Sequence, residues 1–157
     1  MSKLQTPFRY DFVGSFLRPQ ALKDVKTAYQ AGKISKEQYD KVADEEIAKV
    51  VAKQKELGFH IITDGEFRRT FWHLDFMWGF EGVAHEVADN GVQFNDELAV
   101  LEDTYLVGKI KAKAHPFVEY FKFLKQFEDE NTVAKYTIPA PAQTFQQMII
   151  PINFKTT

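Results

Sequence analysis

The chain has 157 residues, a formal net charge of -2 and no cysteine. The length fits one domain, residues 1–157, and 45% hydrophobic with 27% charged residues is the balance of a folded protein. No run of about 18 apolar residues is present to span a bilayer. No local basic patch offers a site for nucleic acid or for an acidic membrane surface. The absence of cysteine excludes disulfides, a cysteine nucleophile and a thiolate metal site within this chain. The N-terminal segment lacks the apolar stretch of a secretory signal, so we expect a cytoplasmic protein.

The first elements expected are a strand and a short helix. The strand covers residues 10–13 and ends at Gly14 and Ser15. The helix begins at Pro19 and ends near residue 31, because proline is favoured in the first helical turn and Gly32 is a typical stop.

A long helix over residues 36–57 is the clearest element of the sequence. Ser35 followed by Gln38 is the signature of a capping box at its start. Apolar residues then recur at helical spacing, with Gln54 as the one polar exception, and Gly58 ends the helix.

The segment after this helix predicts a parallel sheet. A short apolar strand, residues 59–63, follows directly and ends at Asp64 and Gly65, which is the spacing of βα alternation. Residues 82–107 interrupt the alternation. The pair Asn90-Gly91, between HEVAD and VQF, predicts a β-hairpin insertion.

Alternation resumes in the last third of the chain. We expect a barrel or sheet strand at 104–112, a helix at 116–128, a strand at 133–138 and the start of a helix at 142–149. The predicted fold class is therefore α/β, with about four strands each followed by a helix, plus the inserted hairpin.

One short stretch, FRRTFWHLDFMWGF at residues 67–80, concentrates six of the aromatic side chains. Aromatic residues bury large areas, so this stretch is interpreted first as a core-filling segment. The alternative is a wall or lid for a flat ligand.

Ligands of parallel α/β folds bind at the carboxyl ends of the strands, which selects three segments here: 14–18, 64–69 and 139–141. Asp64, Glu66, Arg68 and Arg69 follow the 59–63 strand, and such a set of carboxylates and guanidiniums can hold a zwitterion through charge-assisted hydrogen bonds. A solvated turn with an internal salt bridge is the competing interpretation. Gly14 and Ser15 offer a tight turn, a hydroxyl and a backbone amide to a ligand carboxylate, but such pairs are common in turns.

The histidines do not form a metal-ligating set. His60, His73, His85 and His115 are scattered, and no spacing supports a Ser-His-Asp triad or a glycine-rich phosphate loop. We therefore predict no metal site and no catalytic residue from spacing alone.

Three of these segments carry a resemblance to a known family. VGSFLRP at residues 13–19, KQKELGF before IITDGEFRR at 61–69, and TIPAPA at 137–142 occur in order, each of the first two at the end of an expected strand. Over residues 8–148 the chain resembles the cobalamin-independent methionine synthases, most of all short members similar to the catalytic C-terminal domain.

The resemblance implies a (β/α)8 barrel, a zinc ion that activates the thiol of homocysteine, and a methylated folate as methyl donor. It implies that Ser15 holds the carboxylate of the amino acid and that Glu66 holds its amino group. Gly14, Asp64 and Arg69 would complete the substrate-binding set, with Asp64 and Arg69 equally suited to a supporting role.

The length departs from this pattern, because a complete barrel needs about 250 residues. The His, Glu and Cys zinc ligands of the family come from the later half of the barrel, and this chain has no cysteine. We expect an N-terminal half of a barrel, from a truncation or a split gene, without the zinc site.

Two functions remain open. One is a methyltransferase domain, or part of one, acting on homocysteine or a similar thiol; the other is a non-catalytic module that binds an amino acid or assembles with another chain. A half-barrel leaves strand edges and interior residues such as Val13, Ile61, Ile62 and Ile138 uncovered, which predicts a homo-oligomer or a complementing second half.

Overall fold

The computed structural model describes residues 12–87, 92–94, 97–99 and 102–150. The chain forms two compact units. One consists of Met1–Thr70 and Glu119–Thr137, and the other of Phe71–Val118 and Ile138–Thr157. That residues 1–157 act as a single domain stays a prediction.

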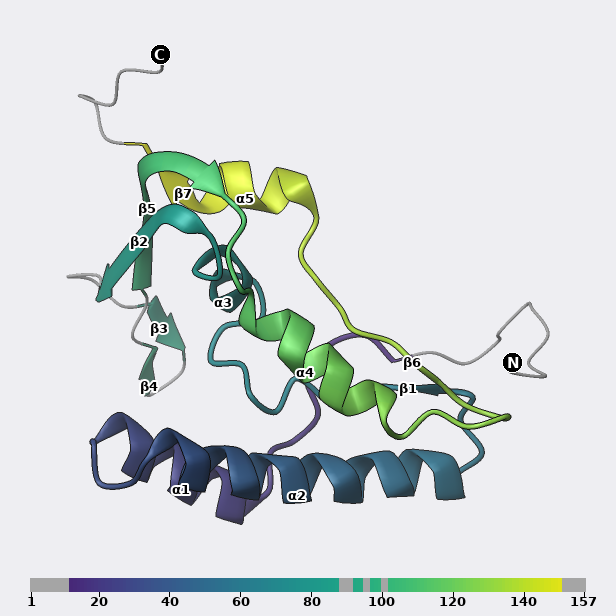
Figure 1. Cartoon of the computed structure of the whole chain (residues 1–157). Coiled ribbons are helices and arrows are strands. Elements are labelled where there is room, and N and C mark those ends of the chain that lie inside the picture. Colours follow the sequence, from purple (N-terminus) through teal and green to yellow (C-terminus); the bar gives the residue numbers. More distant parts are fainter. Residues whose placement is uncertain (1–11, 88–91, 95–96, 100–101, 151–157) are drawn as a thin grey trace. The chain divides into compact units, whose positions relative to one another are not determined.

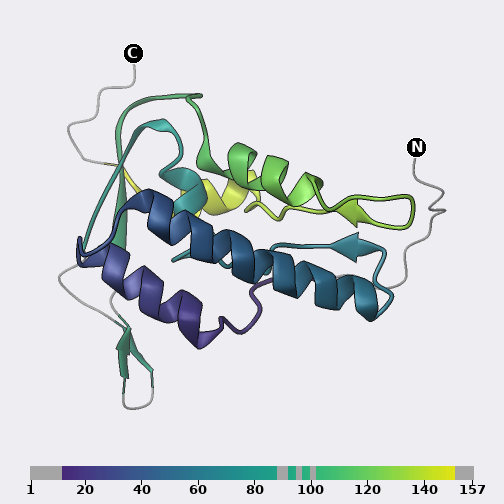
Figure 2. The ribbon, with the colours of Figure 1, turned by 60° about the horizontal axis from the view of Figure 1, so that its bottom comes forward.

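The first unit contains two helices, a parallel pair of strands and the part of a further helix that follows Val118 (Figure 1). Helices α1 (Gln20–Gln30) and α2 (Lys36–Glu56) pack against each other, and strands β1 (Ile61–Ile62) and β6 (Val133–Ala134) are parallel. Figure 2 shows β1 directly after α2, with β6 beside it. This helix followed by a parallel strand confirms the α/β alternation expected around residue 58.

The capping box predicted for α2 is present. The Ser35 hydroxyl accepts a hydrogen bond from the backbone N–H of Gln38, and the Gln38 side chain accepts one from the backbone of Ser35. Both pairs satisfy N–H groups that a helix start leaves without partners. At the other end, Gly58 adopts a positive φ of 81°, as a helix stop requires.

The core of this unit lies between α2, the β1–β6 pair and the part of α4 (Pro116–Lys125) that follows Val118. Its members are apolar residues at helical or strand spacing. The fully or nearly fully buried ones are Leu22, Tyr39, Ala43, Ile47, Val51, Ile62, Phe67 and Leu124.

The second unit is built around a mixed sheet in the order β2-β5-β7. Strands β2 (Glu81–Val87) and β5 (Glu102–Lys111) are antiparallel, and β7 (Met148–Ile149) pairs with β5 in parallel. The short helices α3 (Leu74–Met77) and α5 (Pro141–Gln147) belong to the same unit. Strands β3 (Val92–Phe94) and β4 (Glu97–Ala99) form a separate antiparallel pair.

The predicted hairpin has a different pairing. Asn90 and Gly91 lie outside the described residues, but VQF pairs with Glu97–Ala99 and not with HEV, whose partner is β5. The ten-residue β5 offers β2 a longer ladder than the three residues of VQF, and a longer ladder satisfies more backbone groups. The strand expected at 104–112 is present as a sheet strand, β5, which ends at Lys111 and has β2 and β7 as its partners.

Other boundaries also differ from the expectations. Tyr10 and Asp11 lie outside the described residues, and Phe12 and Val13 are not in a strand. The strands expected at 59–63 and 133–138 are reduced to two residues each, and the helix expected at 116–128 ends at Lys125. Residues 142–149 divide into the end of α5 and β7. Within the described ranges the strands form three separate sheets and no closed barrel.

The aromatic stretch divides between the two units, and most of its rings pack within the unit to which they belong, as the core-filling interpretation predicts. Phe67 is buried in the first unit. In the second, Trp78 stacks on His85 with ring centroids 3.8 Å apart, and its indole N–H donates to the Thr104 hydroxyl at 3.0 Å. Trp72 is the exception, with 49% of its surface exposed. No helix in the described part of the chain is both long and apolar enough to cross a membrane.

Candidate functional site

The loop that follows β1 has an unusual backbone. Gly65 and Glu66 both adopt positive φ, 64° and 57°. The Oδ1 atom of Asp64 accepts a hydrogen bond from the backbone N–H of Glu66 at 2.9 Å, which fixes this turn. A positive φ is costly for a residue with a side chain, so the contacts of Glu66 must compensate for the strain.

Three side chains surround the carboxylate of Glu66, which is only 5% exposed. The Ser15 hydroxyl donates to Oε2 at 2.9 Å, and the Thr137 hydroxyl donates to Oε1 at 2.8 Å. The Arg69 guanidinium donates to Oε1 at 3.2 Å and forms a buried ion pair. The turn therefore aims the Glu66 carboxylate at the loop that ends with Ser15.

Arg69 joins this cluster to the segment after β6. Its side chain is 2% exposed, donates to the backbone carbonyl of Thr137 and lies over the ring of Tyr136 at 4.9 Å. Burial and the nearby Asp64 carboxylate raise the pKa of Tyr136 far above its usual range, so its phenol stays neutral.

Two further cations hold the backbone of the loop. The Arg18 guanidinium donates to the carbonyl oxygens of Glu66 at 3.0 Å, Phe67 at 3.4 Å and Arg69 at 2.9 Å. The Lys26 ammonium donates to the Arg69 carbonyl at 2.9 Å. These contacts satisfy carbonyl groups that the turn removes from regular structure and fix the loop onto α1 and the segment before it.

Asp64 contributes a second buried carboxylate. Its exposure is 2%, and burial raises the pKa of this carboxyl; the Glu66 N–H and the nearby guanidiniums of Arg69 and Arg68 act in the opposite direction. The side chain shapes the turn through the Glu66 N–H, which fits the supporting role left open for it.

A buried amide anchors the base of the loop to α2. The Gln54 side chain donates to the Thr63 carbonyl at 2.8 Å and accepts from the Thr63 N–H at 2.9 Å. The Gln54 side chain thus satisfies the backbone N–H and C=O groups of Thr63, as a neighbouring strand would. Its signal in the sequence is the single polar residue in the apolar stripe of the helix.

The structure thus brings together Ser15, Glu66 and Arg69. Asp64 lies in the same turn and accepts a hydrogen bond from the backbone of Glu66. Gly14 has a positive φ of 95°, and an added Cβ there would meet open space, so only its backbone conformation is special. The sequence interpretation missed Thr137 as a partner of Glu66 and gave no role to Arg18.

No group of three or more His, Cys, Asp or Glu side chains suited to a metal ion occurs among the residues that the structure describes. His60 contacts the Asn131 carbonyl, His85 pairs with Glu102, and His115 contacts the Phe76 carbonyl. These side chains do not fit a zinc site, and we derive no step through a metal.

The comparison with protein families decides the relationship. The catalytic-domain model of the cobalamin-independent synthases matches residues 9–115. The chain belongs to the cobalamin-independent methionine synthase family. The resemblance seen in the 13–19 and 61–69 motifs is confirmed.

Curated relatives in this family include two of different character. The uncharacterized protein YxjH of Bacillus subtilis is 37% identical over 141 residues, which are 90% of this chain and 37% of that protein. The 5-methyltetrahydropteroyltriglutamate–homocysteine methyltransferase of Thermotoga sp. strain RQ2 is 36% identical over 72 residues, 46% of this chain and 10% of that protein. The chain therefore spans less than two fifths of the length of these relatives.

Solved structures of the family share the fold. A putative vitamin-B12-independent methionine synthase from Listeria monocytogenes aligns with a TM-score of 0.75 at 38% identity, covering 95% of this chain and 41% of that one. A B12-independent methionine synthase from Shewanella sp. W3-18-1, solved in complex with selenomethionine, aligns with a TM-score of 0.59 at 19% identity, covering 78% and 35%. The second likeness concerns the fold alone.

Proposed function

We propose that this chain carries the amino-acid-binding loops of a methyltransferase catalytic domain that acts on homocysteine, within a (β/α)8 barrel of which it forms one part. The observation that supports this most is the buried Glu66 carboxylate, which a hydroxyl from the Ser15 loop meets at 2.9 Å. In this proposal Glu66 accepts hydrogen bonds from the substrate ammonium, and the turn at Gly14 and Ser15 receives the substrate carboxylate.

The chemistry of the loop suits this task. Charge-assisted hydrogen bonds to a buried carboxylate are stronger than neutral ones and fix the orientation of the ligand. The Ser15 hydroxyl can rotate, so it can donate to Glu66 without substrate and to the substrate carboxylate when the ammonium takes its place. Arg18 and Arg69 keep the loop in position during this exchange. The chain's own role is to bind and orient the thiol amino acid.

Zinc and a methylated folate belong to the reaction of a complete enzyme of this kind, where zinc would activate the homocysteine thiol. This chain has no cysteine, and the described residues contain no suitable ligand group. We therefore propose that any methyl transfer requires residues supplied from outside this sequence.

Homocysteine titration by calorimetry tests the proposal. Glu66→Ala removes the charge-assisted contact and should weaken binding about tenfold or more. Glu56→Ala is the matched control, because Glu56 lies on α2 with an exposed side chain that pairs with Lys53. Equal affinity in the Glu66 variant and the parent chain would contradict the assignment.

The second candidate is a non-catalytic amino-acid-binding module, which the missing cysteine favours. Both candidates predict that the purified chain alone binds homocysteine without zinc or turnover, and stoichiometric zinc with methionine formation by this chain alone would contradict both. Turnover that appears only when the rest of the barrel is supplied would support the enzyme, and its absence there would support the module.

A further inference from the structure

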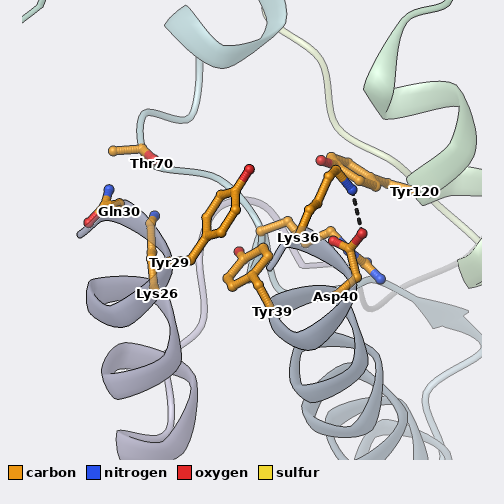
Figure 3. A pocket seen from close by; sticks show the side chains of 9 residues that line it. Lys26, Tyr29, Gln30, Lys36, Tyr39, Asp40, Thr70 and Tyr120 are labelled. Atoms are coloured by element: carbon orange, nitrogen blue, oxygen red, sulfur yellow. Dashed lines mark hydrogen bonds and ion pairs between the residues drawn. The ribbon is translucent and has the colours of Figure 1, made fainter. Parts of the chain in front are cut away.

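A second candidate site lies in the first unit, in a cavity whose lining includes neither Ser15 nor Glu66. The cavity measures about 180 Å³ and lies between α1, α2, Tyr120 of α4 and the loop after β1. Figure 3 shows Tyr29 and Tyr39 in its centre, with Lys26 and Gln30 on one side and Lys36, Asp40 and Tyr120 on the other. Nothing in the proposed methyltransferase function uses this cavity.

The charge of the lining favours an anion. Lys26, Lys36 and Arg68 line the cavity with one carboxylate, Asp40, which pairs with Lys36. Arg68 pairs with Asp44, which lies outside this lining, so the three cations exceed the two carboxylates by one. Tyr39 adds no negative charge, because burial raises the pKa of its phenol to about 12. The excess of cations in a partly enclosed site attracts anions more strongly than the same charges on an open surface.

Arg68 supplies a donor that lacks an acceptor. Its side chain is 4% exposed and pairs with Asp44 through Nη2, but Nη1 is buried without a hydrogen-bond partner. The guanidinium lies over the rings of Tyr120 at 4.9 Å and Phe123 at 5.0 Å, which hold its plane fixed. A fixed guanidinium with an unused donor is suited to an oxyanion, because leaving such a donor unsatisfied is costly.

The tyrosines supply a flat wall. Tyr29 and Tyr39 stack with ring centroids 5.2 Å apart and an angle of 18° between the planes, and Tyr29 remains 39% exposed. An exposed ring at the edge of a stack can take a further ring on the same cavity wall. A neighbouring cavity of about 200 Å³ shares Lys36, Asp40, Arg68 and Tyr120 but adds the carboxylates of Asp44 and Glu119, so the first cavity is the one suited to an anion.

We propose that this cavity binds a small anion that carries a flat ring, an aromatic carboxylate or phosphate ester, with Arg68 and Lys36 at the anionic group and Tyr29 against the ring. The volume suits a single ring with its anionic group and not a dinucleotide.

Binding to the full-length chain is measured by NMR titration with four probes. Phenyl phosphate and benzoate carry both ring and charge, inorganic phosphate lacks the ring, and benzyl alcohol lacks the charge. We expect saturable binding of at least one ring-bearing anion, at least about fivefold tighter than either single-feature probe. The comparison of the two ring-bearing anions identifies which anionic group the site prefers.

Two pairs of variants locate the site. Lys36→Met and Tyr29→Ala should each weaken binding about fivefold or more. Lys41→Met and Thr27→Ala are the controls, because Lys41 and Thr27 are exposed on the same helices and line neither cavity. Circular dichroism verifies folding, and Lys36→Gln and Tyr29→Leu replace any variant that unfolds.

The proposal is overturned if neither ring-bearing anion saturates up to about 10 mM, if inorganic phosphate binds equally well, or if the site variants match their controls. Homocysteine titration of the Lys36 and Tyr29 variants separates this proposal from the proposed function, because neither residue contacts Ser15 or Glu66 in the binding loop and homocysteine affinity is expected to stay unchanged.

Discussion

The hydroxyl of Ser15 donates a hydrogen bond to Oε2 of Glu66 at 2.9 Å, across 51 residues of sequence. This contact joins the loop before α1 to the loop after β1. Because Glu66 has a positive φ and a buried carboxylate, its orientation depends on such donors. Ser15 is therefore the neutral group whose removal probes the site without adding a charge.

Ser15→Ala should weaken both the fold and homocysteine binding. The loss of one donor to a buried carboxylate is expected to lower the free energy of unfolding by about 1–2 kcal/mol and the affinity by about threefold or more. Urea unfolding and calorimetry measure the two effects. Ser35→Ala is the matched control, since it removes the cap of α2, costs about 1 kcal/mol and should leave affinity unchanged. A Ser15 variant that loses stability but binds normally would contradict a role for Ser15 in the site.

A close approach at Gly65 predicts that this position tolerates no side chain. A Cβ there would lie 3.0 Å from the ring of Phe16 and 3.1 Å from that of Phe67, at a φ of 64°. Gly65→Ala should therefore cost the strain of a positive φ, about 1–2 kcal/mol, together with about 1 kcal/mol or more from overpacking.

Comparison with Gly58→Ala isolates the cost of overpacking at Gly65. Gly58 also has a positive φ, 81°, but an added Cβ meets nothing within 4 Å. The midpoint temperature of thermal unfolding should be lower for Gly65→Ala than for Gly58→Ala. Equal midpoints for the two would show that Phe16 and Phe67 move aside without cost.

Local signals were readable from the sequence, and distant contacts were not. Ser35 and Gln38 lie three residues apart, so the capping box needs no tertiary information. Glu66 is a candidate from the sequence because a strand and a turn precede it directly and because its motif resembles that of the family. Its contact with Thr137 spans 71 residues and depends on the parallel pairing of β1 and β6, which no local pattern specifies. The VQF segment was misassigned for the same reason, because its pairing depends on competition with the longer β5.

Asp64 makes the stability of the chain depend on pH in an unusual direction. Its folded pKa is raised by burial, so between the unfolded value of 3.8 and the folded pKa the folded state binds more protons. The contribution of Asp64 to stability therefore falls as pH rises through this window and then stays constant.

Asp64→Asn keeps an oxygen for the Glu66 N–H and removes the charge. We expect this variant to be at least as stable as the parent near pH 7, with the difference shrinking toward about pH 4.

Asp129 provides a control of opposite sign. Hydrogen bonds from Lys55, the Asn131 N–H and Thr132 lower the pKa of its carboxyl. Its contribution is present above the unfolded pKa and is lost as pH falls, so Asp129→Asn should be less stable than the parent at neutral pH. Urea unfolding of both variants from about pH 4 to about pH 7 checks the signs. A neutral-pH loss of stability in Asp64→Asn would contradict the argument from burial.

The uncovered apolar residues near the candidate site predict association. Val13 is 85% exposed and Leu17 is 97% exposed, although Ile62, from the same expected barrel interior, is fully buried. Val13 and Leu17 are branched apolar side chains beside the Ser15 turn, and burying each of them contributes about 1.5–3 kcal/mol to the free energy of association. The chain that covers them is either a second copy or a complementing half. Light scattering at micromolar concentration should therefore detect a dimer or larger assembly, and Val13→Glu with Leu17→Glu should weaken it about tenfold or more.

Leu57→Glu is the control, because Leu57 is also exposed, at 62%, but lies at the far end of α2. A chain that scatters as a monomer throughout, or one that Leu57→Glu disrupts as strongly, would show that the face beside Ser15 does not mediate assembly.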